Sequence, residues 1–276
     1  MVVVACDPLA YLESLPALRL GGVRVRSDAV WFVDWSAQRL NGRLSGGAYK
    51  NVARLAAHRA KVVGAITSTA AEAIAELGHS RTKDEILVLP NLPLSFDEDM
   101  SRSWENRPKG VVYLGGLSSE HGAELLLRAA LALTEAGYSV DVAGDGPAAN
   151  EFAEAATRID GLTFHGMISD PQELAIIMNR SRVGLALYDP TFAMFAYNDS
   201  LKIKDYLHGG LRVVSTISRG GEDDSVRYST YDMESLVSTT LGALNDPLGA
   251  EPRNHDLITE GVQPLLELIA RMEGTS

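Results

Sequence analysis

Residues 198–210 combine a capping pair with a lysine and a carboxylate at the predicted start of a helix. Asp199 or Ser200 can cap this helix. Lys202 and Asp205 then lie three residues apart on one of its faces. A compact ammonium there can neutralise a diphosphate, and a carboxylate one turn later can accept both hydroxyls of a ribose. The alternative is an exposed ion pair, which contributes little to stability.

A glycine pair, Gly115 and Gly116, follows an apolar run and precedes a second predicted helix. Glycines let the backbone approach a ligand closely, and exposed N–H groups at a helix start favour a phosphate. An ordinary turn between a strand and a helix has the same composition, so both interpretations stay open. Met167 comes just beyond another apolar run, at the edge where open α/β sheets bind ligands, and a core position is the other interpretation.

Short apolar runs alternate along the chain with longer helical patterns. The runs are rich in Val, Leu and Ile without strict alternation, which predicts strands that are buried on both faces of parallel sheets. The expected strands are residues 2–5, 29–33, 62–66, 86–89, 111–114, 139–143, 162–164, 183–187 and 212–215. The expected helices are residues 45–60, 70–77, 122–136, 147–158, 171–179, 199–208 and 256–272. The alternation predicts an α/β fold of the doubly wound kind.

Residues 90–109 interrupt this alternation with prolines, serines and an acidic run, which predicts a linker. We therefore expect a partial N-terminal domain with its linker over residues 1–106. A second domain with five strands is expected over residues 107–250. Residues 251–276 are expected to form a C-terminal helix that packs back across the junction.

The composition, with 46% apolar and 22% charged residues among 276, is that of a globular protein and excludes a disordered or collagenous chain. Cys6 has no second cysteine to pair with, which excludes a disulfide scaffold and favours a reducing compartment. No apolar run approaches the roughly 20 residues that cross a bilayer. We expect a cytoplasmic protein without a metal or a cofactor.

The net charge of −11 is unevenly distributed, because the region from Arg19 to Lys61 holds nine basic and two acidic residues. If residues 38–60 are helical, four basic side chains form one stripe and four apolar ones face the core: Arg39, Arg43, Lys50 and Arg54 against Leu44, Ala48, Val52 and Leu55. The region is then either a solvated helix face or a contact with an anionic partner, such as the inner face of a membrane. We expect no nucleic-acid partner, because the acidic remainder of the chain repels it.

Four motifs in the second half resemble the nucleotide-sugar domain of GT-B glycosyltransferases in order and spacing. They lie in residues 111–115, 143–147, 164–166 and 200–215. The likeness is greatest to the family 4 group and to the family 70 glucuronosyltransferase of xanthan biosynthesis. It implies a GT-B fold with two Rossmann-like parallel-sheet domains, the N-terminal one incomplete. It also implies transfer of a sugar from a nucleoside diphosphate sugar, expected to be UDP-linked, to a hydroxyl of a glycan, lipid-linked or small-molecule acceptor.

The resemblance assigns roles to individual residues. A methionine that flanks the base corresponds to Met167, and the lysine and loop tyrosine that touch the diphosphate correspond to Lys202 and Tyr188. The nucleotide-sugar site predicted on these grounds comprises Gly115, Gly116, Leu117, His121, Met167, Tyr188, Ser200, Leu201, Lys202 and Asp205. Residues 30–35 resemble a strand that ends in an acidic residue facing the cleft, which makes Asp34 the candidate general base.

The sequence departs from the family at several positions. Gly116 and His121 stand where family 4 enzymes bring an arginine and a lysine to the diphosphate. Family 4 enzymes carry a pair of acidic residues eight positions apart, the E-x7-E motif. Here Asp205 corresponds to the second acid, and Tyr197 replaces the first. Cys6 replaces a histidine of the acceptor side. The first strands and the acceptor loop are also not recognisable. Three explanations stay open: the true start lies upstream, a partner chain supplies the missing strands, or the acceptor domain is vestigial. The unpaired edge of the first strand is a template for pairing with a partner chain or a second copy. The alternative to an active transferase is a non-catalytic nucleotide-binding subunit of one.

Overall fold

The computed structural model describes residues 2–32, 46–77, 81–94, 104–192, 195, 199–218, 225–246 and 257–273. The chain divides into two compact units. Unit 1 comprises residues 1–92, 193–199 and 258–276, and unit 2 comprises residues 93–192 and 200–257. Each unit contains one parallel sheet, which confirms the predicted α/β class with two parallel-sheet domains.

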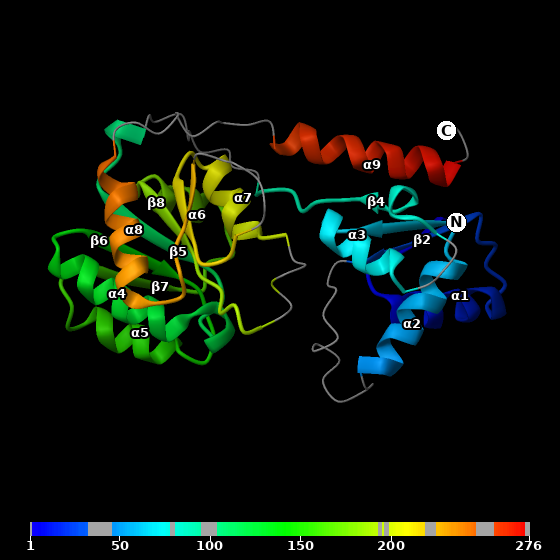
Figure 1. Cartoon of the computed structure of the whole chain (residues 1–276), viewed down its shortest axis with the longest axis horizontal. Helices are drawn as coiled ribbons and strands as arrows, with labels where there is room; N and C mark the ends of the chain where they lie inside the picture. Colours follow the sequence, from blue (N-terminus) through cyan, green and yellow to red (C-terminus); the bar gives the residue numbers. More distant parts are fainter. Residues whose placement is uncertain are drawn as a thin grey trace. The chain divides into compact units, whose positions relative to one another are not determined.

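Unit 1 is built on a four-stranded parallel sheet in the order β1-β2-β3-β4. Its strands are β1 (Val2–Ala5), β2 (Ser27–Phe32), β3 (Val62–Ala65) and β4 (Leu87–Val88). Its helices are α1 (Pro8–Leu20), α2 (Gly46–Arg59), α3 (Ser68–Ala75), η1 (Lys83–Glu85) and α9 (Leu257–Glu273). The first three α-helices bury one face of the sheet, around Phe32 and Val63. On the other face, Leu268 and Met272 of α9 pack against Ala29, Val62 and Leu87. Figure 1 shows α9 alongside β4.

The prediction of which residues form the exposed and buried faces of α2 is only partly correct. Lys50 and Arg54 are exposed, as expected, whereas Arg39, Arg43 and Leu44 lie outside the described residues. Leu55 does not face the core, since it is 41% exposed. The buried face of the helix is formed instead by small side chains and one tyrosine: Tyr49, Ala53, Ala56 and Ala57.

Unit 2 has a six-stranded parallel sheet in the order β10-β9-β8-β5-β6-β7. Its strands are β5 (Gly110–Leu114), β6 (Ser139–Ala143), β7 (Leu162–Gly166), β8 (Val183–Ala186), β9 (Arg212–Ser215) and β10 (Val226–Tyr228). Its helices are η2 (Trp104–Asn106), η3 (Ser119–His121), α4 (Ala123–Glu135), α5 (Ala149–Ala156), α6 (Pro171–Met178), α7 (Leu201–His208) and α8 (Met233–Asn245). The sequence predicted five of these strands and did not predict β10 or α8.

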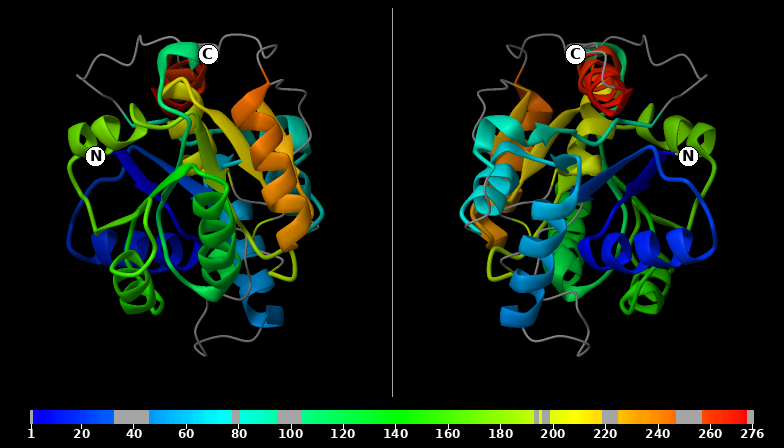
Figure 2. Two further views of the ribbon diagram at one scale, coloured as in Figure 1. Left: turned by 90° about the vertical axis from the view of Figure 1, so that its left-hand side faces the viewer. Right: turned by 90° about the vertical axis from the view of Figure 1, so that its right-hand side faces the viewer.

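Helices cover both faces of this sheet. The main core joins α4, α5 and α8 to Val183 and Leu185 of β8, and α4 and α8 lie side by side (Figure 2). Between those two residues, Gly184 faces the opposite side, where the ring of Tyr206 in α7 occupies the space of a side chain. The sheet of unit 2 is therefore enclosed between two helical layers, and α7 belongs to the second one.

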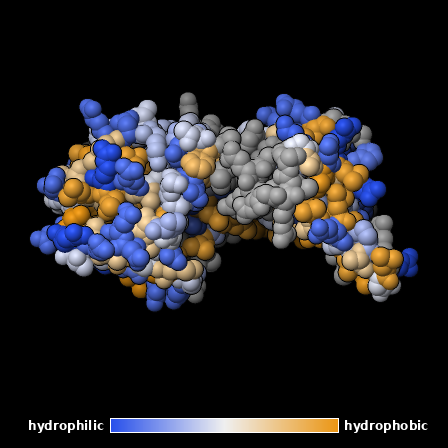
Figure 3. Space-filling view, turned by 90° about the horizontal axis from the view of Figure 1, so that it is seen from below, coloured by the Kyte–Doolittle hydropathy of each residue, from blue (hydrophilic) through white to orange (hydrophobic). Residues whose placement is uncertain are grey.

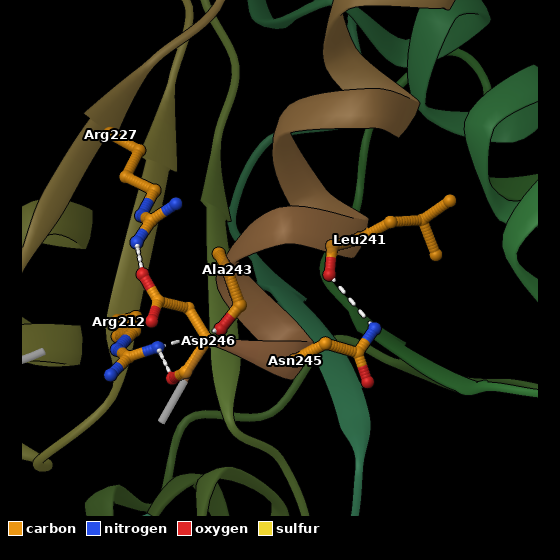
Figure 4. Close-up of polar contacts among 6 residues, drawn as sticks. All are labelled: Arg212, Arg227, Leu241, Ala243, Asn245 and Asp246. Atoms are coloured by element: carbon orange, nitrogen blue, oxygen red, sulfur yellow. Dashed lines mark hydrogen bonds and ion pairs between the residues drawn. The ribbon is translucent and has the colours of Figure 1, made fainter. Parts of the chain in front are cut away.

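The end of the linker and the end of α8 contact the sheet at the amino ends of β8 and β9. The indole of Trp104 donates to the carbonyl of Arg182 (3.1 Å), and the guanidinium of Arg212 lies 3.9 Å from the centre of its ring. Arg212 also donates to the carbonyl of Ala243 (3.0 Å), and Arg227 forms an ion pair with Asp246 (Figure 4). These contacts fix the edge of the sheet that is opposite to the carboxyl ends of its strands.

Hydrophilic side chains cover most of the surface of unit 2 that is seen in Figure 3, with apolar ones between them. Among the described residues, no helix has both the length and the apolar composition that crossing a membrane requires. In the same part of the chain, no three His, Cys, Asp or Glu side chains are grouped as metal ligands would be.

Candidate functional site

The candidate site lies at the carboxyl edge of the unit 2 sheet, between β5 and β8. From β5 the chain adds β6 and β7 on one side, and then returns to add β8, β9 and β10 on the other. The loops that follow β5 and β8 therefore leave the sheet toward opposite helical layers. The carboxyl ends of these two strands are the switch point of the sheet, the place where open α/β sheets bind ligands. Gly115 follows β5 directly, and Tyr188 lies two residues beyond the end of β8.

The amine of Lys202 lies at this switch point, beside Tyr113 and Gly115. Ser200 caps α7, since its hydroxyl accepts a hydrogen bond from the N–H of Ile203 (3.3 Å), and Lys202 follows in the first turn. The Lys202 amine donates to the hydroxyl of Tyr113 (2.8 Å). It also lies 4.3 Å from the centre of the Tyr113 ring and 5.2 Å from that of Tyr188. Two aromatic faces and one hydroxyl thus surround the amine.

Gly115 makes this arrangement sterically feasible. Its φ of +131° lies in the region that favours glycine. A Cβ at this position would stand only 2.5 Å from Cε of Lys202 and 3.1 Å from its amine. The lysine therefore lies directly against the backbone of the glycine turn, where any other residue would displace it.

Tyr113 is a functional candidate that the sequence analysis did not identify. Its hydroxyl accepts the hydrogen bond from Lys202 and donates one to the carbonyl of Gly116 (2.6 Å). A tyrosine within a strand that is otherwise aliphatic and buried, two residues before a glycine pair, was the signal that could have indicated it.

Burial determines the protonation of these groups. It lowers the pKa of the Lys202 amine to about 7 and raises the pKa of the Tyr113 phenol, which the nearby Tyr188 raises further. The phenol is therefore neutral at physiological pH, whereas the amine is partly protonated and partly neutral there. Within the described residues, Lys202 forms no ion pair, so the predicted alternative of a pair with Asp205 does not apply.

His121 and Tyr188 complete the cluster on the other side of the turn. The Nδ1 atom of His121 lies 3.0 Å from the hydroxyl of Ser118 and 3.2 Å from where a Cβ of Gly116 would stand. The ring centres of His121 and Tyr188 are 5.9 Å apart. The structure thus brings six of the predicted site residues together: Gly115, Gly116, His121, Tyr188, Ser200 and Lys202.

The other predicted residues lie apart from this cluster. Leu117 is completely buried in the core, and its N–H donates to the carbonyl of Asp145 (2.8 Å). Leu201 is 49% exposed on the first turn of α7. Met167 is 73% exposed beyond β7, which β6 separates from β5. Asp34, the candidate base, lies outside the described residues.

Asp205 faces the linker. It is buried, and its carboxylate accepts a hydrogen bond from the N–H of Leu94 (2.8 Å). Burial raises its pKa to about 6, and the bond from Leu94 opposes this shift. One oxygen is therefore already occupied, and the predicted contact with a ribose stays a prediction.

The chain was compared with known proteins. No family model matches it, and no curated protein sequence does. Solved structures do match. TarM from S. aureus, solved with UDP, has a TM-score of 0.65 and 12% identity, over 98% of this chain and 55% of TarM. The pneumococcal O-GlcNAc transferase GtfA, solved with UDP and GlcNAc, has a TM-score of 0.63 and 13% identity, over 90% of this chain and 52% of GtfA.

Sucrose-phosphate synthase from Thermosynechococcus elongatus has a TM-score of 0.67 and 15% identity, over 100% of this chain and 74% of the synthase. The chain spans about half the length of TarM and GtfA. At these identities the similarity concerns the fold, and the four-stranded sheet of unit 1 fits an incomplete domain. The chain therefore has the GT-B fold, with two units that each contain a parallel sheet.

Proposed function

We propose that the chain binds a nucleoside diphosphate sugar, UDP-linked, at the carboxyl ends of β5 and β8 and transfers the sugar to a hydroxyl acceptor. The observation that supports this most is the contact of Lys202 with the turn at Gly115. It combines an amine without an acidic partner among the described residues, a backbone that a ligand can approach closely, and a place at the switch point of the sheet.

In this proposal the diphosphate contacts both the Lys202 amine and the adjoining backbone of Gly115 and Gly116. The ammonium neutralises charge on the diphosphate, and this matters most when the bond to the sugar breaks and the leaving group gains charge. Removal of one such positioned contact commonly costs about 3–4 kcal/mol of barrier. His121 and Tyr188 lie where they can contact the same anion, and Met167 would flank the base.

The acceptor side of the proposal depends on Asp34 as the general base that takes the proton from the attacking hydroxyl. The acceptor itself is proposed only as a hydroxyl compound: a glycan, a lipid-linked sugar or a small molecule. The basic residues between Arg19 and Lys61 would suit an anionic acceptor or membrane surface, and Lys50 and Arg54 are exposed for such a contact.

A second candidate function is a nucleotide-binding subunit without activity of its own. It is favoured by the composition of the turn, where Gly116 and His121 replace the arginine and lysine of the family 4 pattern. Lys202 is then the one lysine or arginine that the described residues place at the turn.

Calorimetric titration with UDP, together with an assay of UDP release from a panel of UDP-sugars, separates these possibilities. UDP binding that is weakened about tenfold or more by Lys202→Met supports the site. The matched control is Lys204→Met, on the same helix, which should bind UDP like the unmodified chain. Binding without any release of UDP favours the subunit. If the folded chain does not bind UDP, or if Lys202→Met binds it equally well, the proposed site is wrong.

A further inference from the structure

Among the described residues, no carboxylate balances the charge of the Lys202 amine. Four described carboxylates lie on the segments around it, on η3, on the loop between β8 and α7, and on α7 itself. Each of them is bonded elsewhere: Glu120 to Ser119, Asp189 to Thr191, Asp199 to Asn91 and Asp205 to Leu94. The other ionisable groups on these segments and on β5 are His121, Lys204, His208 and three phenols, those of Tyr113, Tyr188 and Tyr206. Burial raises the pKa of the Tyr113 and Tyr206 phenols, so these two stay neutral. The amine therefore has no counterion in the part of the chain that the structure describes, and a bound anion would supply one.

Tyr113 fixes the direction of this amine. Its hydroxyl is a bridge that accepts from Lys202 (2.8 Å) and donates to the carbonyl of Gly116 (2.6 Å). Since both ends of the bridge lie at the turn, the hydroxyl holds the amine there rather than letting it turn to solvent. A lysine side chain with four rotatable bonds otherwise loses much conformational entropy on binding.

We propose that Tyr113 is a positioning residue for Lys202, and that the amine becomes fully charged only when an anionic diphosphate occupies the turn, so that binding takes up one proton from solvent. This inference rests on the proposed function, because it assumes that the turn binds a diphosphate. It adds a coupling between ligand binding and protonation, and a role for a residue that no family resemblance assigned.

The expected size of the coupling follows from linkage. With the pKa of the free amine at about 7, roughly nine tenths of the molecules carry a neutral amine near pH 8, and about one tenth near pH 6. A bound anion within hydrogen-bond distance raises that pKa again. UDP binding should therefore take up about 0.9 proton near pH 8, where UDP itself does not titrate. The affinity for UDP falls as the pH rises above 7.

The test is UDP calorimetry near pH 8 in two buffers of different ionisation enthalpy, HEPES and Tris, since the difference in observed enthalpy counts the protons exchanged. At that pH UDP is fully ionised, because its last phosphate proton dissociates near pH 6. We expect an uptake of about 0.9 proton for the unmodified chain and for Lys204→Met. We expect almost none for Lys202→Met. If the uptake disappears in His121→Gln and persists in Lys202→Met, the imidazole is its source and the coupling to Lys202 is wrong.

Tyr113→Phe tests the positioning role, because it removes the hydroxyl and keeps the ring. Loss of an acceptor for the ammonium lowers the amine pKa further. We expect UDP to bind several-fold more weakly near pH 7, and the midpoint of the affinity–pH curve to move to lower pH. Tyr206→Phe is the control. Its hydroxyl accepts from the N–H of Leu114 (2.7 Å), so the change should lower the melting temperature and leave the midpoint in place.

The outcomes are distinct. UDP binding without proton uptake near pH 8, or an uptake that persists in Lys202→Met, overturns the coupling and leaves the proposed function standing. A folded Tyr113→Phe chain with unchanged affinity and midpoint overturns the positioning role. Absence of UDP binding by the folded, unmodified chain overturns the proposed function itself.

Discussion

The side chain of Lys202 fills the space that a Cβ of Gly115 would need, with Cε only 2.5 Å from that position. The two residues are 87 positions apart in the sequence, on α7 and directly after β5. Their contact depends on the neighbouring positions of β5 and β8 in the sheet. It explains why position 115 requires a glycine. The predictions below follow from this contact and from the groups around it.

Gly115→Ala should displace Lys202 and weaken UDP binding about tenfold or more, because the new methyl group and the amine cannot occupy the same space. The positive φ adds backbone strain, which costs of the order of 1–3 kcal/mol in folding stability. Thermal melting and UDP calorimetry measure the two effects separately.

Gly137→Ala is the matched control for that variant. Gly137 also has a positive φ, +86°, but a Cβ there meets nothing within 4 Å. It should therefore lose stability through strain alone and bind UDP with unchanged affinity. Equal UDP affinity in the Gly115→Ala and Gly137→Ala chains would contradict the steric argument.

Lys202→Met should stabilise the fold, and the gain should depend on pH. Burial lowers the amine pKa from 10.5 to about 7, so between these values the unfolded chain binds a proton that the folded protein does not. The stability of the unmodified chain therefore rises with pH across this window. The advantage in melting temperature of the methionine variant should be largest below about pH 7 and shrink toward about pH 10. A gain that is independent of pH would show that the amine is not buried as described.

Asp205→Asn should change the pH dependence of stability with the opposite sign. Burial raises the carboxyl pKa from 3.8 to about 6, so in this window the folded protein holds a proton that the unfolded chain has released. Stability of the unmodified chain falls as the pH rises through the window. The asparagine variant, which can still accept from Leu94, lacks this loss, and its relative melting temperature should rise from about pH 4 to about pH 6 and then level off.

Asp205→Ala separates the hydrogen bond from the charge. It leaves the N–H of Leu94 without its acceptor, which should cost about 1–3 kcal/mol at any pH. If the alanine and asparagine variants melt alike, the bond to Leu94 contributes nothing measurable and the placement of Asp205 against the linker is wrong.

Met167→Ala should leave stability within about 0.5 kcal/mol, because the side chain is 73% exposed. If this methionine flanks the base, the variant binds UDP more weakly and inorganic pyrophosphate as before. Calorimetry with both ligands makes the comparison. A loss of pyrophosphate binding, or an unchanged affinity for UDP, would remove Met167 from the site.

The sequence predicted the parallel sheets because continuous Val, Leu and Ile runs are recognisable without tertiary information. It did not predict α1, whose pattern is interrupted by Pro16, or α8, which is rich in Ser and Thr. The short strand β10 was also not predicted, because its exposed Tyr228 gives it no continuous apolar signal. These elements are stabilised mainly by tertiary packing, which local patterns do not contain.

The candidate site, like the fold, was only partly predictable from the sequence. Motif spacing was sufficient to propose Lys202 and the glycine pair together, but the function of Tyr113 depends on a hydrogen bond between residues 89 positions apart. Asp205 was expected beside a ribose, and its bond to Leu94 depends on the path of the linker. Side-chain direction at such positions is decided by contacts that are distant in sequence.

The most direct test of the account is a crystal structure of the chain with UDP. We predict that a diphosphate oxygen lies about 3 Å from the Lys202 amine and next to the backbone of Gly115 and Gly116. UDP bound elsewhere, with the Lys202 amine still bonded only to Tyr113, would contradict it.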